Sequence, residues 1–343
     1  MRHLLNTLYI LTEDTYLSLD NENVVINQGD TVLRRFPLNM LDHILYFGYK
    51  GASPALMGEC AKRNISLCFY KPSGKFLARI VGKQYGNVLL RKKQYRVSED
   101  ENESCQIARN LIVGKIFNSR SVLERVKRDH GLSIDVEVLS QASNEMLSLA
   151  RVSKNCTNLN ILRGFEGEAA SLYFAQFDRL ILQHKDFFCF NGRIKRPPTD
   201  PVNAMLSFAY TLLANDCASA LEGVGLDPYV GFLHRDRPGR MSLALDLMEE
   251  LRSVFADRFV LTMINNRIVN KKSFIKQENG AVLLTDSARK DFLSAWQERK
   301  KVAIIHPFIE EKVPWGLVPF IQAQLLARVL RGDLEEYPSF LRK

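Results

Sequence analysis

The sequence predicts a two-domain α+β protein, with a small N-terminal β domain that carries one helix and an all-α C-terminal domain. Residues 7–80 contain short β-rich runs separated by acidic, Asn or Gly turns at strand-like spacing. Residues 104–343 are instead mostly helical by period. A length of 343 residues, with 46% hydrophobic and 25% charged residues, is typical of a soluble globular protein long enough for two domains.

The N-terminal β domain is assigned to residues 1–85. Its expected strands are LYILT, TYLSLD, NVVIN, TVLRRFPL, ISLCFY and KFLARIVG, with a hairpin turn around residues 72–74. The segment SPALMGECAKRN has helical periodicity and is expected to pack against the sheet. Short strands leave edges and an apolar face that one helix does not cover, so we expect this domain to pair with a second copy.

A basic stretch followed by an acidic one marks the boundary, which we place in a helical, charged linker of residues 86–103. The basic residues are Lys75, Arg79, Lys83, Arg91, Lys92, Lys93 and Arg96, and the acidic run is SEDENE. Two interpretations stay open here, a solvated linker and a surface that contacts nucleic acid.

The C-terminal domain, residues 104–343, is expected to be a set of long helices. The main helical segments are CQIARNLIVGKIFNSRSVLERV, NEMLSLARVS, NILRGFEGEAASLYFAQFDRLIL, PVNAMLSFAYTLLANDCASALE and ALDLMEELRSVFADRF. A short hairpin is predicted around residues 278–280. The basic, proline-containing segment KDFFCFNGRIKRPPTDPVN is typical of an exposed loop, the kind of segment that often meets ligands.

Charge and cysteine usage narrow the class of protein. The formal net charge is +9 and the pI is near 9.2, which favours a polyphosphate partner. The six cysteines form no C-x-x-C pair, so neither a zinc site nor a disulfide framework is indicated. No apolar run is long enough to cross a bilayer and the start does not resemble a signal peptide, so we expect a cytoplasmic protein that does not engage a membrane.

The stretch GFLHRDRPGRMSLALDLMEE, residues 231–250, is the strongest candidate for chemistry. His234 precedes a turn-forming Arg-Pro-Gly, and Ser242 is a plausible N-cap for the helix that follows. Asp246 and Glu249, three positions apart, project from neighbouring points on one helix face. An apolar stripe beside them indicates that the helix is packed; its members are Leu243, Leu247, Leu251 and Val254.

A third carboxylate is offered by Glu166, which stands between Gly164 and Gly167 on a predicted helix. Glu168 faces the other side of that helix, because consecutive residues are rotated by about 100°. Glu166, His234 and Glu249 would suit Mg²⁺ or Mn²⁺ and hence phosphoryl transfer. On spacing alone, a structural histidine and helix-surface acids remain strong alternatives.

The segments RGFEGEAASLYF and GFLHRDRPGRMSLALDLMEELR together resemble the CRISPR-associated integrases of spacer acquisition. The resemblance covers nearly the whole chain. It extends to LDHILYFGYKGASPALMGECAKRNISLCFY, PPTDPVNAMLSFAYTLL and QAQLLARVLRGDLEEYPSFL.

This resemblance implies a catalytic set of Glu166, His234, Asp246 and Glu249 on a Mg²⁺- or Mn²⁺-binding centre. Glu166, His234 and Glu249 match the family's metal ligands, while Asp246 is expected to assist indirectly or to bind metal in some states. The matched ligands are flanked by arginines that could hold phosphate oxygens or pair with acids instead, namely Arg163, Arg237, Arg240 and Arg252. Tyr173 and Asn203 are expected to pack or to brace helices.

The family implies a metal-dependent DNA endonuclease and integrase that inserts short fragments into a CRISPR array by transesterification, as part of prokaryotic antiviral defence. Its implied partners are DNA, a second copy of the chain through the β domain, and a small CRISPR-associated adaptation protein. The ending RGDLEEYPSFL resembles a subtype that also uses an iron-sulphur nuclease. Two other functions stay open, a branched-DNA repair nuclease (junction resolvase) and a DNA-binding scaffold without catalysis.

Overall fold

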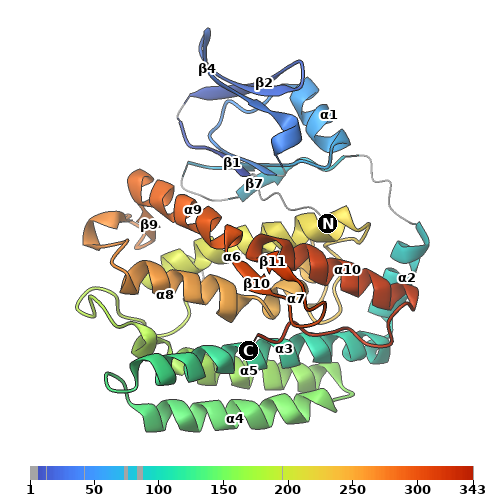
Figure 1. Cartoon of the computed structure of the whole chain (residues 1–343), viewed down its shortest axis with the longest axis vertical. Helices are drawn as coiled ribbons and strands as arrows, with labels where there is room; N and C mark the ends of the chain where they lie inside the picture. The colour runs from blue at the N-terminus through green and yellow to red at the C-terminus, as the bar shows by residue number, and fades with distance from the viewer. Residues whose placement is uncertain are drawn as a thin grey trace. The chain divides into compact units, whose positions relative to one another are not determined.

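The computed structural model describes residues 7–12, 14–41, 43–72, 76–82, 88–194 and 196–342. The chain divides into two compact units, both drawn in Figure 1. The first comprises Met1–Tyr85, Leu284–Ala303 and Val313–Leu317, and the second comprises Gly86–Leu283, Ile304–Lys312 and Val318–Lys343. The β-strands of the first unit and the long helices of the second make this a two-domain α+β protein, as the sequence predicted.

The first unit contains two sheets. One has the strand order β1-β5-β6-β7, formed by β1 (Thr7–Ile10), β5 (His43–Phe47), β6 (Ser66–Tyr70) and β7 (Phe76–Arg79). Its first three strands are parallel and β7 is antiparallel to β6. The other sheet is an antiparallel meander of β2 (Thr15–Asp20), β3 (Asn23–Gln28) and β4 (Thr31–Pro37), followed by the short 3₁₀ helix η1 (Leu38–Met40).

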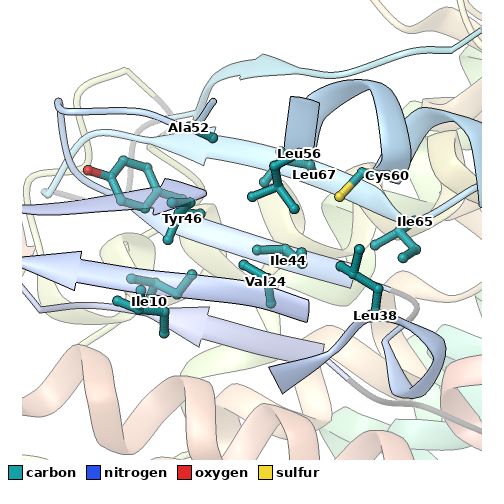
Figure 2. Close-up of a cluster of buried hydrophobic side chains, with 12 residues drawn as sticks. Ile10, Val24, Leu38, Ile44, Tyr46, Ala52, Leu56, Cys60, Ile65 and Leu67 are labelled. Atoms are coloured by element: carbon teal, nitrogen blue, oxygen red, sulfur yellow. The ribbon is translucent and has the colours of Figure 1, made fainter. Parts of the chain in front are cut away.

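The core of the first unit lies between the sheets and helix α1 (Pro54–Lys62), as Figure 2 shows. Val24 and Ile26 alternate along β3, which is the period that buries one face of a strand. Ser53 caps α1 by accepting a hydrogen bond from the backbone N–H of Leu56. The predicted strands and their single helix are therefore present within residues 1–85, although the turn predicted at 72–74 lies mostly outside the described residues.

Helix α9 (Asp286–Lys301) also belongs to the first unit, although the sequence analysis placed it in the helical domain. The Tyr9 hydroxyl lies 3.4 Å from the Gln297 side-chain oxygen, which joins residues nearly 290 positions apart. A helical period predicts that a segment is a helix but not which sheet or helix it packs against. The sequence pattern therefore could not predict that α9 belongs to the first unit.

The second unit is built from long helices. They are α2 (Val88–Glu99), α3 (Glu101–His130), α4 (Val136–Lys154), α5 (Leu159–Ala175), α6 (Pro201–Gly223), α7 (Ser242–Glu249), α8 (Arg258–Asn265) and α10 (Val318–Arg331). Helices α3 to α6 each begin after an N-cap residue whose side chain accepts a hydrogen bond from a backbone N–H of the first turn. These N-cap residues are Asp100, Asp135, Asn158 and Asp200, in chain order. Figure 1 shows α3, α4 and α5 packed side by side.

The segment predicted as one helix over residues 244–259 is interrupted, and this prediction was wrong. Helix α7 ends at Glu249, residues Arg252–Asp257 form the π-helical segment η3, and α8 begins at Arg258. The predicted N-cap at Ser242 was also wrong, because Met241 holds that position and the Ser242 hydroxyl instead donates to the Arg235 carbonyl. A π-helical turn adds a residue to a helical period and recurs at functional sites.

The remaining elements are short. They are the 3₁₀ helices η2 (Phe177–Leu180), η4 (Lys271–Ser273) and η5 (Trp315–Leu317), the hairpin of β8 (Phe274–Lys276) and β9 (Val282–Leu284), and the paired strands β10 (Ala303–Ile305) and β11 (Lys312–Pro314). The hairpin predicted around residues 278–280 is thus present. All six cysteines are free, and no helix in the described part of the chain is long and apolar enough to cross a bilayer.

Some of the basic residues predicted at the domain boundary are bonded to neighbours within the second unit. The Arg91 guanidinium donates to the Gly225 carbonyl at 3.1 Å, and the Lys93 ammonium bonds the Glu103 carboxylate at 2.7 Å. Lys92 and Arg96 are exposed on α2. Lys75 and Lys83 lie outside the described residues.

Candidate active site

Asp246 on α7 is fully buried and faces the loop of residues 231–234. Its carboxylate accepts backbone N–H groups from Phe232, Leu233 and His234 at 2.7 to 3.0 Å. The His234 Nδ1 also lies 2.5 Å from Asp246 Oδ1. With its ring held through Nδ1, His234 presents Nε2 as the free nitrogen, which is the arrangement by which a carboxylate orients a metal-binding histidine.

Gly231 lets this loop approach the carboxylate. A Cβ added there would stand 2.9 Å from both Asp246 Oδ2 and the Ser242 Cβ, and 3.0 Å from the Ser242 carbonyl carbon. Two of those three neighbours belong to the start of α7, which cannot shift without moving the helix. A side chain at position 231 would therefore push the loop away from Asp246.

Glu249, one turn further along α7, faces into the second unit and is only 2% exposed. Its Oε2 lies 2.7 Å from the Lys115 ammonium, and its Oε1 lies 3.0 Å from the Arg252 guanidinium. The His234 Nε2 is 3.8 Å from Glu249 Oε1. Burial opposes ionisation of this carboxyl, but Arg252 and Lys115 outweigh it and hold the pKa of Glu249 below its usual range.

Glu166 reaches the same place from α5. Its Oε1 forms a hydrogen-bonded ion pair with the Lys115 ammonium, so one cation joins Glu166 and Glu249. Cβ atoms added at Gly164 and Gly167 would meet nothing within 4 Å, so the face of α5 that carries these glycines is open. At about 100° per residue, Gly164 lies on the side of α5 opposite Glu166, so the glycines neither leave room over Glu166 nor serve close packing against another helix.

Beyond Arg252, a buried group of hydroxyls surrounds Asp257. The Tyr210 hydroxyl donates to Asp257 at 2.5 Å, and the Arg252 guanidinium lies over the Tyr210 ring at 5.1 Å. Burial raises the pKa of Asp257 to about 6, against the lowering effects of Tyr210 and Arg252. Tyr173 is buried beside this group, in the packing role expected for it.

A small cavity opens between these elements. Its volume is about 20 Å³, and its lining includes Lys115, Tyr173, Tyr210, Arg252 and Asp257. That volume holds roughly one water molecule. The cavity lies beside Lys115 and Arg252 and is too small for a nucleotide.

The four arginines expected near the site have different surroundings. Arg163 donates to the Leu233 carbonyl at 2.9 Å and so braces the loop that carries His234. Arg252 is paired with Glu249. Arg237 is exposed and Arg240 is half-buried, on the turn that follows His234. These last two are the ones whose position leaves them open to a phosphate.

Asn203 braces the loop before α6, as expected from its sequence context. Its side chain is fully buried; it accepts from the Ile194 N–H at 3.0 Å and donates to the Gly192 carbonyl at 2.8 Å. Arg193 adds a hydrogen bond to the same amide oxygen at 2.7 Å. The proline-rich segment is therefore held by its own hydrogen bonds.

The donor set fits a divalent ion in kind. Two carboxylates from α5 and α7 already share one cation, and the imidazole Nε2 faces the second carboxylate. Oxygen donors with one imidazole suit Mg²⁺ or Mn²⁺. As they stand, however, no three His, Cys, Asp or Glu side chains among the described residues converge closely enough to hold an ion, because the Lys115 ammonium lies between Glu166 and Glu249.

The structure places Glu166, His234, Asp246 and Glu249, which the sequence predicts to converge, in this one region. Nothing in the sequence-based prediction named Lys115, Tyr210 or Asp257. The signal for Lys115 was a lone lysine inside the apolar run NLIVGKIF on α3, where a charged side chain needs a buried partner.

A unit of β-sheets and a helical unit with a buried carboxylate–imidazole site make this a two-domain α+β protein. The family model described as CRISPR associated protein Cas1 matches residues 8–298, and the chain belongs to this family. Its relatives include CRISPR-associated endonuclease Cas1 2 of Rhodospirillum rubrum, 51% identical over the full length of both proteins. Cas1 1 of Chlorobaculum tepidum is 45% identical over 99% of each.

Another relative is a fusion of two proteins, the CRISPR-associated exonuclease Cas4/endonuclease Cas1 fusion of Geobacter sulfurreducens. It is 34% identical over 98% of this chain, which matches 60% of that longer protein. These names place the chain among CRISPR-associated endonucleases.

Solved structures share the fold at low sequence identity. A casposase bound to its integration product has a TM-score of 0.82 at 23% identity, covering 99% of this chain and 95% of that one. The Cas1 protein TM1797 of Thermotoga maritima has a TM-score of 0.80 at 20% identity, covering 95% and 97%. A chain of a Cas6-RT-Cas1–Cas2 complex has a TM-score of 0.81 at 22% identity, covering 98% of this chain and 36% of that one.

Proposed function

We propose that this chain is a metal-dependent DNA endonuclease and integrase that inserts short DNA fragments into a CRISPR array by transesterification. The observation that carries the proposal is the meeting of Glu166 and Glu249, from two helices, on one cation beside the free nitrogen of His234. Membership of the Cas1 endonuclease family supports it, and the fold shared with a casposase that was solved on its integration product is consistent with it.

Glu166, His234 and Glu249 are the residues that would hold Mg²⁺ or Mn²⁺. Such an ion, when bound, polarises a phosphate oxygen and stabilises the charge on the attacking and leaving oxygens. Asp246 keeps the His234 ring in place through Nδ1 and leaves Nε2 available. We therefore assign Asp246 to positioning and the other three to metal binding.

The proposed reaction conserves the number of phosphodiester bonds. The 3′ hydroxyl of the fragment attacks phosphorus at the repeat boundary, a new P–O bond forms, and the P–O bond to the 3′ oxygen of the preceding nucleotide on that strand breaks. The attacking hydroxyl loses its proton and the leaving oxygen gains one. No external energy is needed, so the protein's contribution is positioning and charge stabilisation.

Arg237 and Arg240 are the proposed phosphate contacts, because they lie on the turn that follows His234. Arg163 and Arg252 would act indirectly, since one holds the His234 loop and the other pairs with Glu249. An arginine fork holds a phosphate through two parallel hydrogen bonds.

The proposed assembly contains a homodimer, DNA and further adaptation proteins. Two insertions at opposite ends of one repeat require two sites at a fixed separation, which one chain does not provide. A small partner is supported by the solved Cas1–Cas2 complex, and an iron-sulphur trimming nuclease by the relative in which an exonuclease is fused to the Cas1 part.

A strand-transfer assay tests the function. A labelled short duplex with free 3′ hydroxyl ends is incubated with repeat-containing plasmid, the small partner and Mg²⁺ or Mn²⁺. Joining is expected with the wild type and absent with Glu166→Ala, His234→Ala or Glu249→Ala, while DNA binding persists. Glu168→Ala, exposed on the same helix α5, is the matched control and should join normally.

The outcomes separate the three functions. Cleavage of branched DNA without joining would indicate a junction resolvase, and no metal-dependent activity on any substrate would indicate a scaffold. Near-normal joining by one of the three alanine variants would remove that residue from the ligand set.

A further inference from the structure

Lys115 is a buried lysine held by two acids from other helices. It lies near the middle of α3, where Ile112 and Ile116 are packed in the core, and its own side chain is 10% exposed. Its ammonium contacts Glu166 on α5 and Glu249 on α7. A buried charge without partners is costly, so these two contacts are what permits a lysine at this position.

The Lys115 ammonium lies between the two carboxylates that would hold the metal ion. Mg²⁺ binds oxygen at about 2.0–2.1 Å, so an ion shared by Glu166 and Glu249 would stand where the Lys115 Nζ now stands. Nζ is 2.7 Å from Glu249 Oε2. Two cations cannot occupy one position between the same oxygens, because their repulsion at such short range is large.

We propose that Lys115 is an internal counter-ion that competes with the divalent ion for Glu166 and Glu249 and leaves both carboxylates when the ion binds. The inference rests on the proposed function, which supplies the ion. In the metal-free protein the ammonium holds α3, α5 and α7 together by neutralising two acids. In the loaded protein that role passes to the ion.

The displaced ammonium stays near the reacting phosphate. Lysine carries its charge on a flexible four-carbon chain, so Nζ can move several ångströms while α3 stays fixed. The Glu166 side chain is 28% exposed, so the Lys115 ammonium lies close to solvent. Lys115 would then contact a non-bridging oxygen of the DNA phosphate, and it is a positioning residue for both the ion and the substrate.

Binding of Mn²⁺ alone to the full-length protein tests the competition. The signal of free Mn²⁺ is followed by electron paramagnetic resonance while the ion is titrated into wild type, Lys115→Met, Lys115→Gln and Lys127→Met. Lys127 lies on the same helix and pairs with Glu124, which makes it the matched control. Removing a positive charge at contact distance should tighten binding by about tenfold or more in both Lys115 variants, and Lys127→Met should match the wild type.

Unchanged or weaker Mn²⁺ binding by folded Lys115→Met and Lys115→Gln would overturn the proposal. If either variant is unfolded without metal, circular dichroism with added Mn²⁺ decides: the ion should restore the helical signal because it replaces the ammonium, and failure to restore it also counts against competition. Glu166→Ala separates the two levels of inference. Equal Mn²⁺ binding by the wild type and Glu166→Ala would contradict the proposed metal site itself. Weaker binding by Glu166→Ala, with no change in the Lys115 variants, would support the metal site and contradict only the competition by Lys115.

Discussion

Asp246 shows how one buried carboxylate organises the residues around it. It accepts three consecutive backbone N–H groups, from residues 232 to 234, and also contacts the His234 ring. Successive N–H groups that converge on an anion form a binding concavity, here filled by the protein's own side chain. The hydrogen bonds of the Asp246 carboxylate therefore run to the loop that carries His234, which is the basis of its proposed positioning role.

We predict that Asp246→Asn weakens Mn²⁺ binding by about ten- to a hundredfold, the usual effect of losing a partner that orients a metal-binding histidine. One carboxylate oxygen becomes an NH₂ group that faces N–H donors, so the loop moves and the imidazole is misplaced. Titration with Mn²⁺ measures the change. Asp236→Asn, on the same loop but exposed, should bind like the wild type. Complete loss of binding, as deep as in Glu166→Ala, would make Asp246 a direct ligand.

His306 predicts a dependence of stability on pH. It is fully buried, contacts Gln322 at 3.2 Å, and burial lowers its pKa to about 4. The unfolded chain takes up this proton near pH 6.5 and the folded chain near pH 4. The contribution of neutral His306 to the free energy of unfolding is therefore fully present above pH 6.5. It is lost as the pH drops towards 4, which lowers the free energy of unfolding by up to about 3 kcal/mol.

His306→Gln should remove this part of the pH dependence, which the difference between the wild-type and variant unfolding midpoints measures in metal-free buffer. The comparison with the variant is needed because a second buried group contributes to the pH dependence of the wild type. Burial raises the pKa of Glu250 to about 7, and Gln322 bonds both Glu250 and His306. Parallel profiles for wild type and variant between pH 6.5 and 4 would contradict the assignment to His306.

Several of these residues were predictable from the sequence, and others depended on tertiary contacts. Glu166, His234, Asp246 and Glu249 were found from motif and resemblance. The different neighbours of Asp246 and Glu249, the His234 loop and Lys115, were not predictable, because three-residue spacing only puts the two acids on one helix face. Lys115 lies more than fifty positions from its nearer partner, a separation over which a helical period carries no information.

At the scale of elements, the C-terminal segment of residues 337–342 ties α3 to the end of α7. Asn118 on α3 donates to the carbonyls of both Glu250 and Phe340, at 2.7 and 2.6 Å. The Glu250 carboxylate accepts from Gln322, from the Tyr337 hydroxyl and from the Phe340 N–H. The site residues Lys115 and Glu249 lie on the two elements joined in this way.

Gly114 allows this close packing. A Cβ at that position would lie 3.0 Å from Glu250 Oε2 and 3.3 Å from the Ser339 Cβ. The residue next to Lys115 is therefore in contact with the residue next to Glu249. Buried polar networks of this kind are stable only when every member has its partner.

We predict that Tyr337→Phe lowers stability by about 1–3 kcal/mol, because it removes one donor to a buried carboxylate and one acceptor for Gln322. Chemical denaturation measures this loss. Mn²⁺ affinity should also fall, since Glu249 is adjacent to Glu250. Tyr229→Phe is the control, because Tyr229 is 46% exposed in the same unit. Lower stability with unchanged Mn²⁺ affinity would show that the segment supports the fold without positioning the site.

The elements themselves were largely predicted, except where backbone geometry departs from a regular period. The sequence ALDLMEELRSVFADRF has an apolar pattern compatible with one continuous helix, yet the structure contains a π-helical segment within it. Residues of this segment such as Val254 and Phe255 are buried, as an apolar pattern predicts, but that pattern does not distinguish a π-helical turn from an α-helical one.

At the scale of the whole molecule, each unit has its own core, and the first unit presents an exposed strand edge. In β4 the side chains of Val32 and Leu33 are 47% and 40% exposed. β4 pairs with β3 on one side and ends the three-stranded sheet. An apolar sheet edge of this kind is a surface for pairing with another chain, which agrees with the proposed homodimer.

We predict that the full-length protein is a dimer and that Leu33→Glu converts it to a monomer, because the new charge would be buried without a partner in the interface. Light scattering gives the molar mass, to be compared with 39.2 kDa for one chain. Ile275→Glu, at an apolar position in the second unit that is 55% exposed, should remain dimeric. A dimer that is lost with Ile275→Glu and kept with Leu33→Glu would place the interface in the helical unit.

The adjacent acids Glu249 and Glu250 limit how the length of this chain can vary. One is turned towards Lys115 and held ionised, and the other towards Tyr337, where burial raises its pKa. Inserting or deleting one residue between Asp246 and Glu249 would rotate both buried acids by about 100° away from their partners and break both sets of contacts together. Length changes are therefore excluded in that interval, whereas the exposed turn between β8 and β9 can absorb them, and sequences that share this fold should differ in length there.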